Sequence, residues 1–149
     1  MKYLQSFLLL VPLFAAAFGQ HSGAIGSGGN IFDLPRFAMN ESYGGLPRFK
    51  LTANALPLPV IDITPADPMI GANNPPAMGF TITGPVKGLN RLSCFSSHDG
   101  RARLERLGQR RIEIRVKKAF PKGRTRVNCT LPVGDGRWYW FGRQFYRPK

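Results

Sequence analysis

Alternation of apolar and polar side chains is clearest in the second half of the chain. Between residues 111 and 117, two isoleucines and a valine alternate with arginine, glutamate and lysine. A period of two predicts a strand with one buried face. Residues 126–131 repeat the pattern, and residues 91–94 follow it over a shorter stretch. Each of these two runs places a cysteine on its apolar face, so we expect Cys94 and Cys129 to face the core.

Turn-forming residues separate these runs at 98–100, 121–123 and 133–136. The last turn predicts a hairpin that joins residues 126–131 to a strand over 137–146. Short strands at about ten-residue spacing indicate an all-β fold, which we expect to be a small immunoglobulin-like β-sandwich. A helix over 101–109 is the main alternative for that segment, because two leucines there lie three residues apart.

The first half of the chain is rich in proline and weakly charged. Proline removes a backbone donor and restricts the residue before it, so we expect short extended pieces over 49–52, 60–64 and 80–83. Residues 20–30 are rich in glycine and serine and predict a flexible linker. The expected organisation has four parts: a signal peptide over 1–19, the linker over 20–30, a proline-containing extension over 31–55 and a basic β-sandwich domain over 56–149.

The start of the chain has the features of a secretory signal. Lys2 precedes an apolar run, and the small residues Ala17 and Gly19 predict cleavage near Gln20, with a cut after Ala17 as an alternative. The run is shorter than the roughly 20 residues that span a bilayer. We therefore expect a secreted or periplasmic protein without a transmembrane segment.

Charge is concentrated in the same half as the cysteines. The chain has a net charge of +13, and the residues after Asn90 hold sixteen of its lysines and arginines but four of its acids. Two cysteines in an oxidising compartment predict one disulfide, Cys94–Cys129, which links two strands. Closing a loop of this length contributes about 3–4 kcal/mol in the chain-entropy description.

The aromatic run over residues 137–143 contains the main candidate site. Strand alternation predicts that Trp138 and Trp140 face the core, with Trp140 against the disulfide, and that Gly142 marks a bulge or a close backbone approach. The same alternation places every second residue outward: Arg137, Tyr139, Phe141 and Arg143. Tyr139 between arginines could then stack on a sugar while the guanidinium groups hold an anion. A core strand with cationic edges explains the same residues without a ligand.

Outward-facing cations on other strands could extend this site into a continuous basic sheet face. Arg111 and Arg124 would contribute to it, and the candidate ligand-binding residues are Arg115, Lys117, Arg126, Arg137, Tyr139 and Arg143. Such a face attracts anionic polymers, and in a protein exported by a bacterium acidic glycans and peptidoglycan are the nearest ones. A solvated surface that prevents strand association is the simpler reading. The aromatic residues are not spread through the basic patch, which argues against nucleic acid.

Catalytic and metal sites have little support in the sequence. The triad residue types at Ser96–Asp99 are adjacent in the chain and cannot converge as a triad does. We therefore expect a non-catalytic module with no cofactor and no metal. One remote alternative is a copper-dependent polysaccharide oxidase, in which His21 as the first residue of the processed chain, together with His98, would hold the copper.

Four strings carry a resemblance to a known family: Gly79–Gly84, Leu92–Ser96, Gly123–Pro132 and Gly136–Phe145. Residues 56–149 resemble the β-sandwich accessory region of secreted bacterial polysaccharide deacetylases. The chain lacks the catalytic motifs of those enzymes, so the resemblance implies a glycan-associated accessory module. We expect binding of anionic glycan or cell-wall polymer, and a protein-interaction or assembly module of the cell envelope, docking a partner through its proline-rich half, is the alternative.

Overall fold

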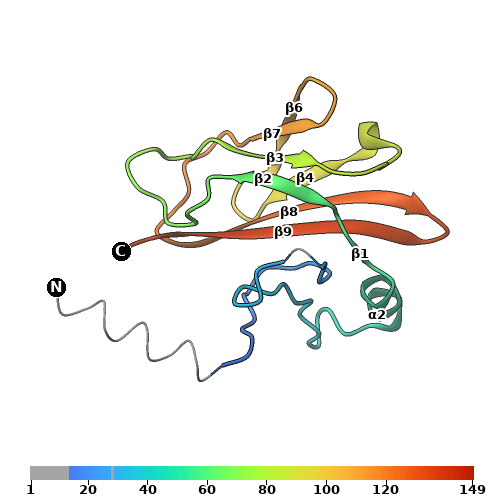
Figure 1. Ribbon diagram of the computed structural model, residues 1–149. Helices are drawn as coiled ribbons and strands as arrows, with labels where there is room; N and C mark the ends of the chain where they lie inside the picture. Colours follow the sequence, from blue (N-terminus) through green and yellow to red (C-terminus); the bar gives the residue numbers. More distant parts are fainter. Residues whose placement is uncertain (1–13, 28) are drawn as a thin grey trace.

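The computed structural model describes residues 14–27 and 29–149 and shows two packed β-sheets (Figure 1). The predicted signal peptide lies mostly in residues 1–13, outside the described residues. In spatial order, the five-stranded sheet contains β1 (Leu56–Pro57), β9 (Arg137–Arg147), β8 (Gly123–Gly134), β4 (Ser93–Ser96) and β5 (Gly100–Arg101). The four-stranded sheet contains β2 (Val60–Thr64), β3 (Met78–Ile82), β7 (Arg111–Arg115) and β6 (Arg103–Leu107). All neighbours pair antiparallel except β1 and β9.

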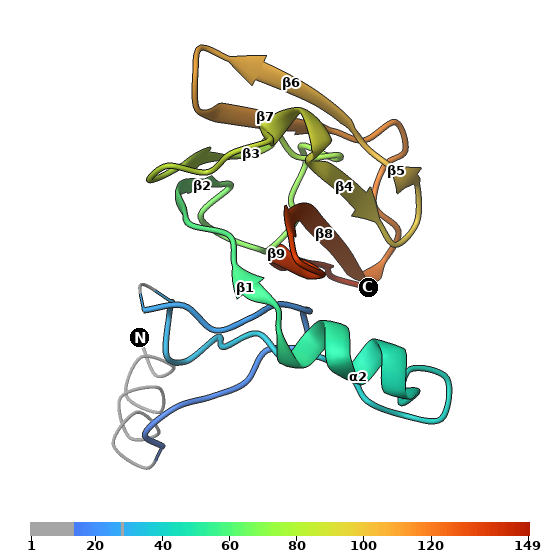
Figure 2. The ribbon, with the colours of Figure 1, turned by 90° about the vertical axis from the view of Figure 1, so that its right-hand side faces the viewer.

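The two sheets face each other (Figure 2), and side chains from their inner faces form the hydrophobic core. Ile112 and Ile114 of β7, together with Val127 and Leu131 of β8, are at most 3% exposed. These side chains occupy every second position, so the alternation predicted for both strands is confirmed. The predicted hairpin is also present, because β8 and β9 pair along almost their whole length.

The predicted disulfide is confirmed and lies inside one sheet. Cys94 of β4 pairs directly with Cys129 of β8, and both side chains are fully buried. In antibody domains the disulfide bridges the two sheets of the sandwich. Here the bond instead joins two neighbouring strands of one sheet, β4 and β8.

The alternative of a helix over residues 101–109 does not hold, and the extended piece predicted at 49–52 is wrong. Residues 103–107 form the edge strand β6, because pairing with β7 turns Leu104 toward the core. Residues 46–53 form the helix α2 (Leu46–Ala53) and not an extended piece at 49–52. Pro47 is compatible with this helix because it lies in the first turn, where a backbone N–H has no partner within the helix. The expected strand over 60–64 is β2, and the piece expected at 80–83 overlaps β3.

A further short helix, η2 (Leu89–Arg91), leads into β4. Within the described parts of the chain, no helix combines the length and apolar character needed to cross a bilayer.

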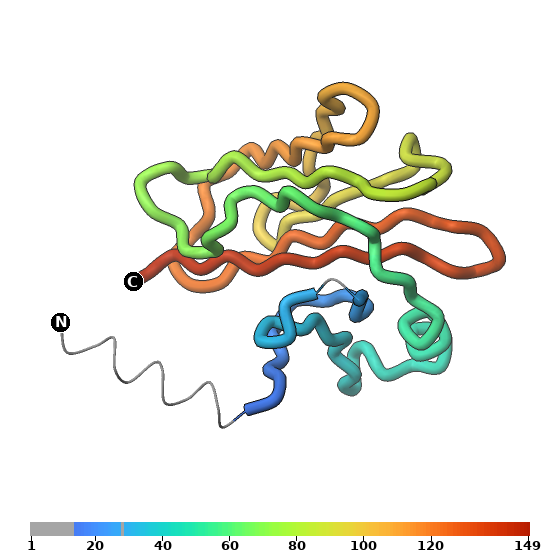
Figure 3. The backbone as a smooth tube through the Cα atoms, viewed as in Figure 1, coloured from blue at the N-terminus to red at the C-terminus, as the bar shows by residue number. Residues whose placement is uncertain are grey.

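Residues 14–27 and 29–55 form a layer outside the five-stranded sheet, which we call the N-terminal arm (Figures 1 and 3). Two of its segments run side by side: the Ala17 N–H donates to the Ile31 carbonyl at 2.8 Å, and the Arg36 N–H donates to the His21 carbonyl at 3.0 Å. The glycine- and serine-rich stretch expected to be a linker lies against β9, with His21 and Gly23 buried. The arm therefore covers part of a sheet face that would otherwise be open.

Candidate functional site

The predicted orientation of β9 is wrong. Tyr139 pairs with the buried Leu131 and Phe141 with the buried Cys129, and directly paired residues share a face. Tyr139 and Phe141 accordingly pack against the core, and the ring of Phe141 lies 5.0 Å from that of Phe80. Alternation indicates which residues share a face of β9, but apolar residues occur on both faces, so it does not indicate which one is the core.

Trp140 lies on the outer face, under the N-terminal arm. Its ring makes an edge contact with Phe37, with ring centres 5.1 Å apart, and the Arg48 guanidinium lies 5.3 Å from the centre of the Trp140 ring. The predicted close approach at Gly142 is confirmed, since a Cβ atom there would lie 1.9 Å from the Ser22 carbonyl oxygen. This half of the outer sheet face is therefore occupied by the protein itself.

The arginines at the two ends of the aromatic run have partners within the chain. The Arg143 Nη2 donates to the carbonyls of Pro65 and Ala66 at 2.6 and 2.7 Å, and burial lowers the pKa of this guanidinium. Arg137 pairs with Asp135 at 3.0 Å in the hairpin turn. Arg143 thus holds the loop around Pro65 against β9, and Asp135 partly compensates the charge of Arg137.

The cations of β7 face away from those of β8. The two strands belong to different sheets, and the outer faces of a sandwich point in opposite directions. Arg111 and Arg115 flank Glu113 at 2.7 and 3.4 Å, and Arg115 also donates to Glu105 at 2.9 Å. The hydrogen bond from Arg115 lowers the pKa of Glu105.

Lys117 follows β7, with its side chain exposed and its backbone N–H donating to Asp99. The predicted continuous basic face is therefore not formed. The four-stranded sheet bears a charge-compensated cluster, and the remaining candidate, Arg126, lies on the other side of the molecule.

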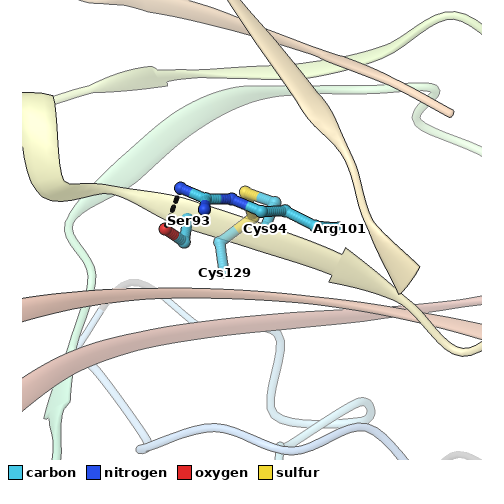
Figure 4. The surroundings of a disulfide bond; sticks show 4 residues. All are labelled: Ser93, Cys94, Arg101 and Cys129. Carbon is cyan, nitrogen blue, oxygen red and sulfur yellow. Dashed lines mark hydrogen bonds between the residues drawn. A yellow bond between two sulfur atoms is a disulfide. The ribbon is translucent and has the colours of Figure 1, made fainter.

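An open basic and aromatic surface remains on the five-stranded sheet beyond the arm. Phe95 of β4 is 45% exposed and pairs with Arg101 of β5 on one side and Asn128 of β8 on the other. Arg126 lies two residues before Asn128 and is also exposed. We call Phe95, Arg101 and Arg126, with Arg124 and Tyr146 at one end, the basic–aromatic face. Figure 4 shows Arg101 lying along β4, where its Nη2 donates to the Ser93 hydroxyl at 3.3 Å.

The cations of this face lack acidic partners. Among the described residues, no carboxylate lies within 4.0 Å of Arg101, Arg124 or Arg126, although Arg124 contacts the side-chain oxygen of Gln20. The two sheets therefore differ: one bears arginines neutralised by glutamates, and the other bears uncompensated arginines beside an exposed ring. Sequence reasoning found Arg126 and missed Phe95 and Arg101. The inward Cys94 could have revealed Phe95, because the next residue of a strand faces outward.

A cleft of about 450 Å³ separates the arm from β1, β2 and β9. Its walls are mainly apolar, and its ionisable side chains are His21, Asp33 and Arg143. His21 is 6% exposed, with Nδ1 3.6 Å from the Asp33 carboxylate. Burial is the main cause that lowers the His21 pKa, Arg143 adds to this, and Asp33 opposes it. In the described part of the chain, no three His, Cys, Asp or Glu side chains gather as a metal site would require.

Comparison with known protein families, curated proteins and solved structures found no match for this chain.

Proposed function

We propose that this protein is a secreted, non-catalytic module that binds an anionic polysaccharide through the basic–aromatic face. The observation that carries the proposal is the exposed Phe95 ring between Arg101 and Arg126, two arginines without acidic partners. An aromatic face packs on the C–H surface of a sugar ring, and a guanidinium group binds a carboxylate or sulfate through two parallel hydrogen bonds. Phe95 thereby takes the stacking role that the sequence suggested for Tyr139.

Features of the sequence support the same assignment. The predicted signal peptide directs the chain to a secreted or periplasmic location, where acidic glycans and cell-wall polymers are accessible. The resemblance to accessory regions of polysaccharide deacetylases agrees with glycan association without catalysis. We also propose that the sandwich is immunoglobulin-like, because of the number and spacing of its strands.

Retention on columns of acidic polysaccharide and peptidoglycan tests the proposal. We expect Arg126→Gln to weaken binding about tenfold, because a hydrogen bond to a charged group contributes about 1.5–3 kcal/mol. We expect a similar loss for Phe95→Ala, because covering an aromatic side chain contributes about 1.5–3 kcal/mol. Arg106→Gln is the matched control, since it removes the same charge from the exposed edge strand β6.

The control distinguishes a shaped site from general charge attraction. We expect Arg106→Gln to leave retention nearly unchanged at moderate salt, where exposed charges are screened beyond about 10 Å. If Arg106→Gln and Arg126→Gln weaken retention equally, or if Phe95→Ala has no effect, the proposed site is wrong.

A further inference from the structure

The N-terminal arm exposes an unusual amount of apolar surface. Seven of the large hydrophobic side chains that are exposed in the described residues belong to the part of the arm that follows the predicted cleavage near Gln20. They are Ile25, Ile31, Phe32, Met39, Tyr43, Leu46 and Phe49. Single exposed hydrophobic residues are ordinary, but a concentration of them in one layer indicates an interaction surface.

Within this layer, α2 turns two of its large apolar residues toward solvent. No residue of the helix is buried, and Leu46 and Phe49 are 63% and 55% exposed. These two residues and Lys50 lie on one stripe, because positions three and four apart share a helix face. Arg48 points the other way, with its guanidinium within 6 Å of the rings of Phe37, Tyr43 and Trp140.

The cation–π contacts of Arg48 therefore fix the rotation of α2 and turn its apolar stripe outward. Two further exposed side chains, Met39 and Tyr43, contact the Arg48 side of the helix and do not lie on the stripe. The Met39 sulfur lies 4.0 Å from the Thr52 hydroxyl, and the Tyr43 ring centre lies 5.9 Å from the Arg48 guanidinium.

The shape and charge of this surface favour a lipid bilayer as its partner. Leu46 and Phe49 protrude and do not line the cleft, so they offer no groove for a folded partner. A bilayer accepts protruding side chains without a complementary shape. Lys50 lies in the stripe, the only acid of the preceding loop is Glu41, and the chain has a net charge of +13. Anionic lipid headgroups would complement this charge.

We propose that α2, through Leu46, Phe49 and Lys50, docks the protein on the surface of an anionic phospholipid bilayer. Leu46 and Phe49 enter the boundary between headgroups and acyl chains, and Lys50 stays among the headgroups. The helix has eight residues and lies on the bilayer. This surface is distinct from the basic–aromatic face and does not depend on the function proposed for it.

Flotation with phosphatidylcholine–phosphatidylglycerol vesicles tests the proposal. The protein is used as an exporting host releases it, and mass spectrometry verifies the same first residue in every variant, so that any apolar leader contributes equally. We expect Leu46→Ser and Phe49→Ser each to lower the partition coefficient about tenfold, because each loses one buried apolar side chain. Leu107→Ser, which removes a 55% exposed leucine from β6, should leave it unchanged.

A second measurement detects insertion directly. In Phe49→Trp, the added indole emission should shift to shorter wavelength when anionic vesicles are added, and circular dichroism should match the unsubstituted protein. Phe95→Ala should bind vesicles normally. The proposal is overturned if Leu107→Ser weakens binding as much as Phe49→Ser, if Phe49→Ser binds normally, or if the emission of the added indole does not shift.

Discussion

Replacing Gly142 by alanine tests whether the N-terminal arm packs on β9. A Cβ atom at this position would lie 1.9 Å from the Ser22 carbonyl oxygen, whereas ordinary contacts begin at about 3.4 Å. It would also lie 2.9 Å from the Asn128 Oδ1. Because the nearest atom belongs to the backbone, no side-chain rotation relieves the overlap. The arm must move away from β9 at this point.

The expected cost is about 1–3 kcal/mol of unfolding free energy, the usual range for an added methyl group in a packed interior. If the arm lifts away, Trp140 also loses its contacts with Phe37 and Arg48. Urea denaturation measures the cost. Limited trypsin digestion reports the lifting, because Arg36 and Lys50 lie in the arm.

Gly71→Ala is the matched control, since a Cβ atom there meets nothing within 4 Å. We expect Gly71→Ala to retain the stability and the digestion rate of the unsubstituted protein. If Gly142→Ala behaves in the same way as Gly71→Ala, the arm does not lie on β9 as described.

Three further predictions concern the rest of the fold. The pKa of His21 is lower in the folded protein than the ordinary 6.5, so folding favours its neutral form. The unfolding free energy should therefore fall as the pH drops below about 6.5. His21→Asn should reduce this pH dependence, which urea denaturation at a series of pH values measures. Replacing Cys94 and Cys129 together by alanine should lower the unfolding free energy by about 3–4 kcal/mol, measured by thermal or urea denaturation, because the bond closes a loop of 35 residues. Glu113→Ala should lower the unfolding free energy by about 1–3 kcal/mol, because it leaves Arg111 without its acidic partner while Arg115 keeps Glu105. Adding Arg111→Ala should recover part of the loss, and an additive double variant would contradict this coupling.

Sequence patterns predicted the strands that have one solvated face. In β7 and in much of β8, each outward residue is polar, so the apolar positions identify the core side. The same reasoning failed for β9 because the arm covers its outer face, and apolar residues are favourable on both sides. Trp140 packs against Phe37 of the arm on the outer face of the sheet, and the adjacent Phe141 packs against Phe80 in the core.

Local sequence patterns do not show which strands join the same sheet, and this decides which residues form the candidate site. Arg115 and Arg126 have similar neighbours in sequence, but they belong to different sheets, so they do not lie in one binding site. The presence of Glu105 opposite Glu113 in the β6–β7 pairing decides which arginines are neutralised. That pairing required residues 103–107 to be recognised as a strand, although their two leucines at a spacing of three are compatible with a helix.

The most direct test of the central claim is an NMR titration of isotope-labelled protein with a short acidic oligosaccharide. We predict that the largest chemical-shift changes occur at Phe95, Arg101 and Arg126, and that they persist when salt is raised to a moderate concentration. Shift changes centred on Arg111 and Arg115, or changes spread over both sheets that vanish with salt, would contradict this prediction.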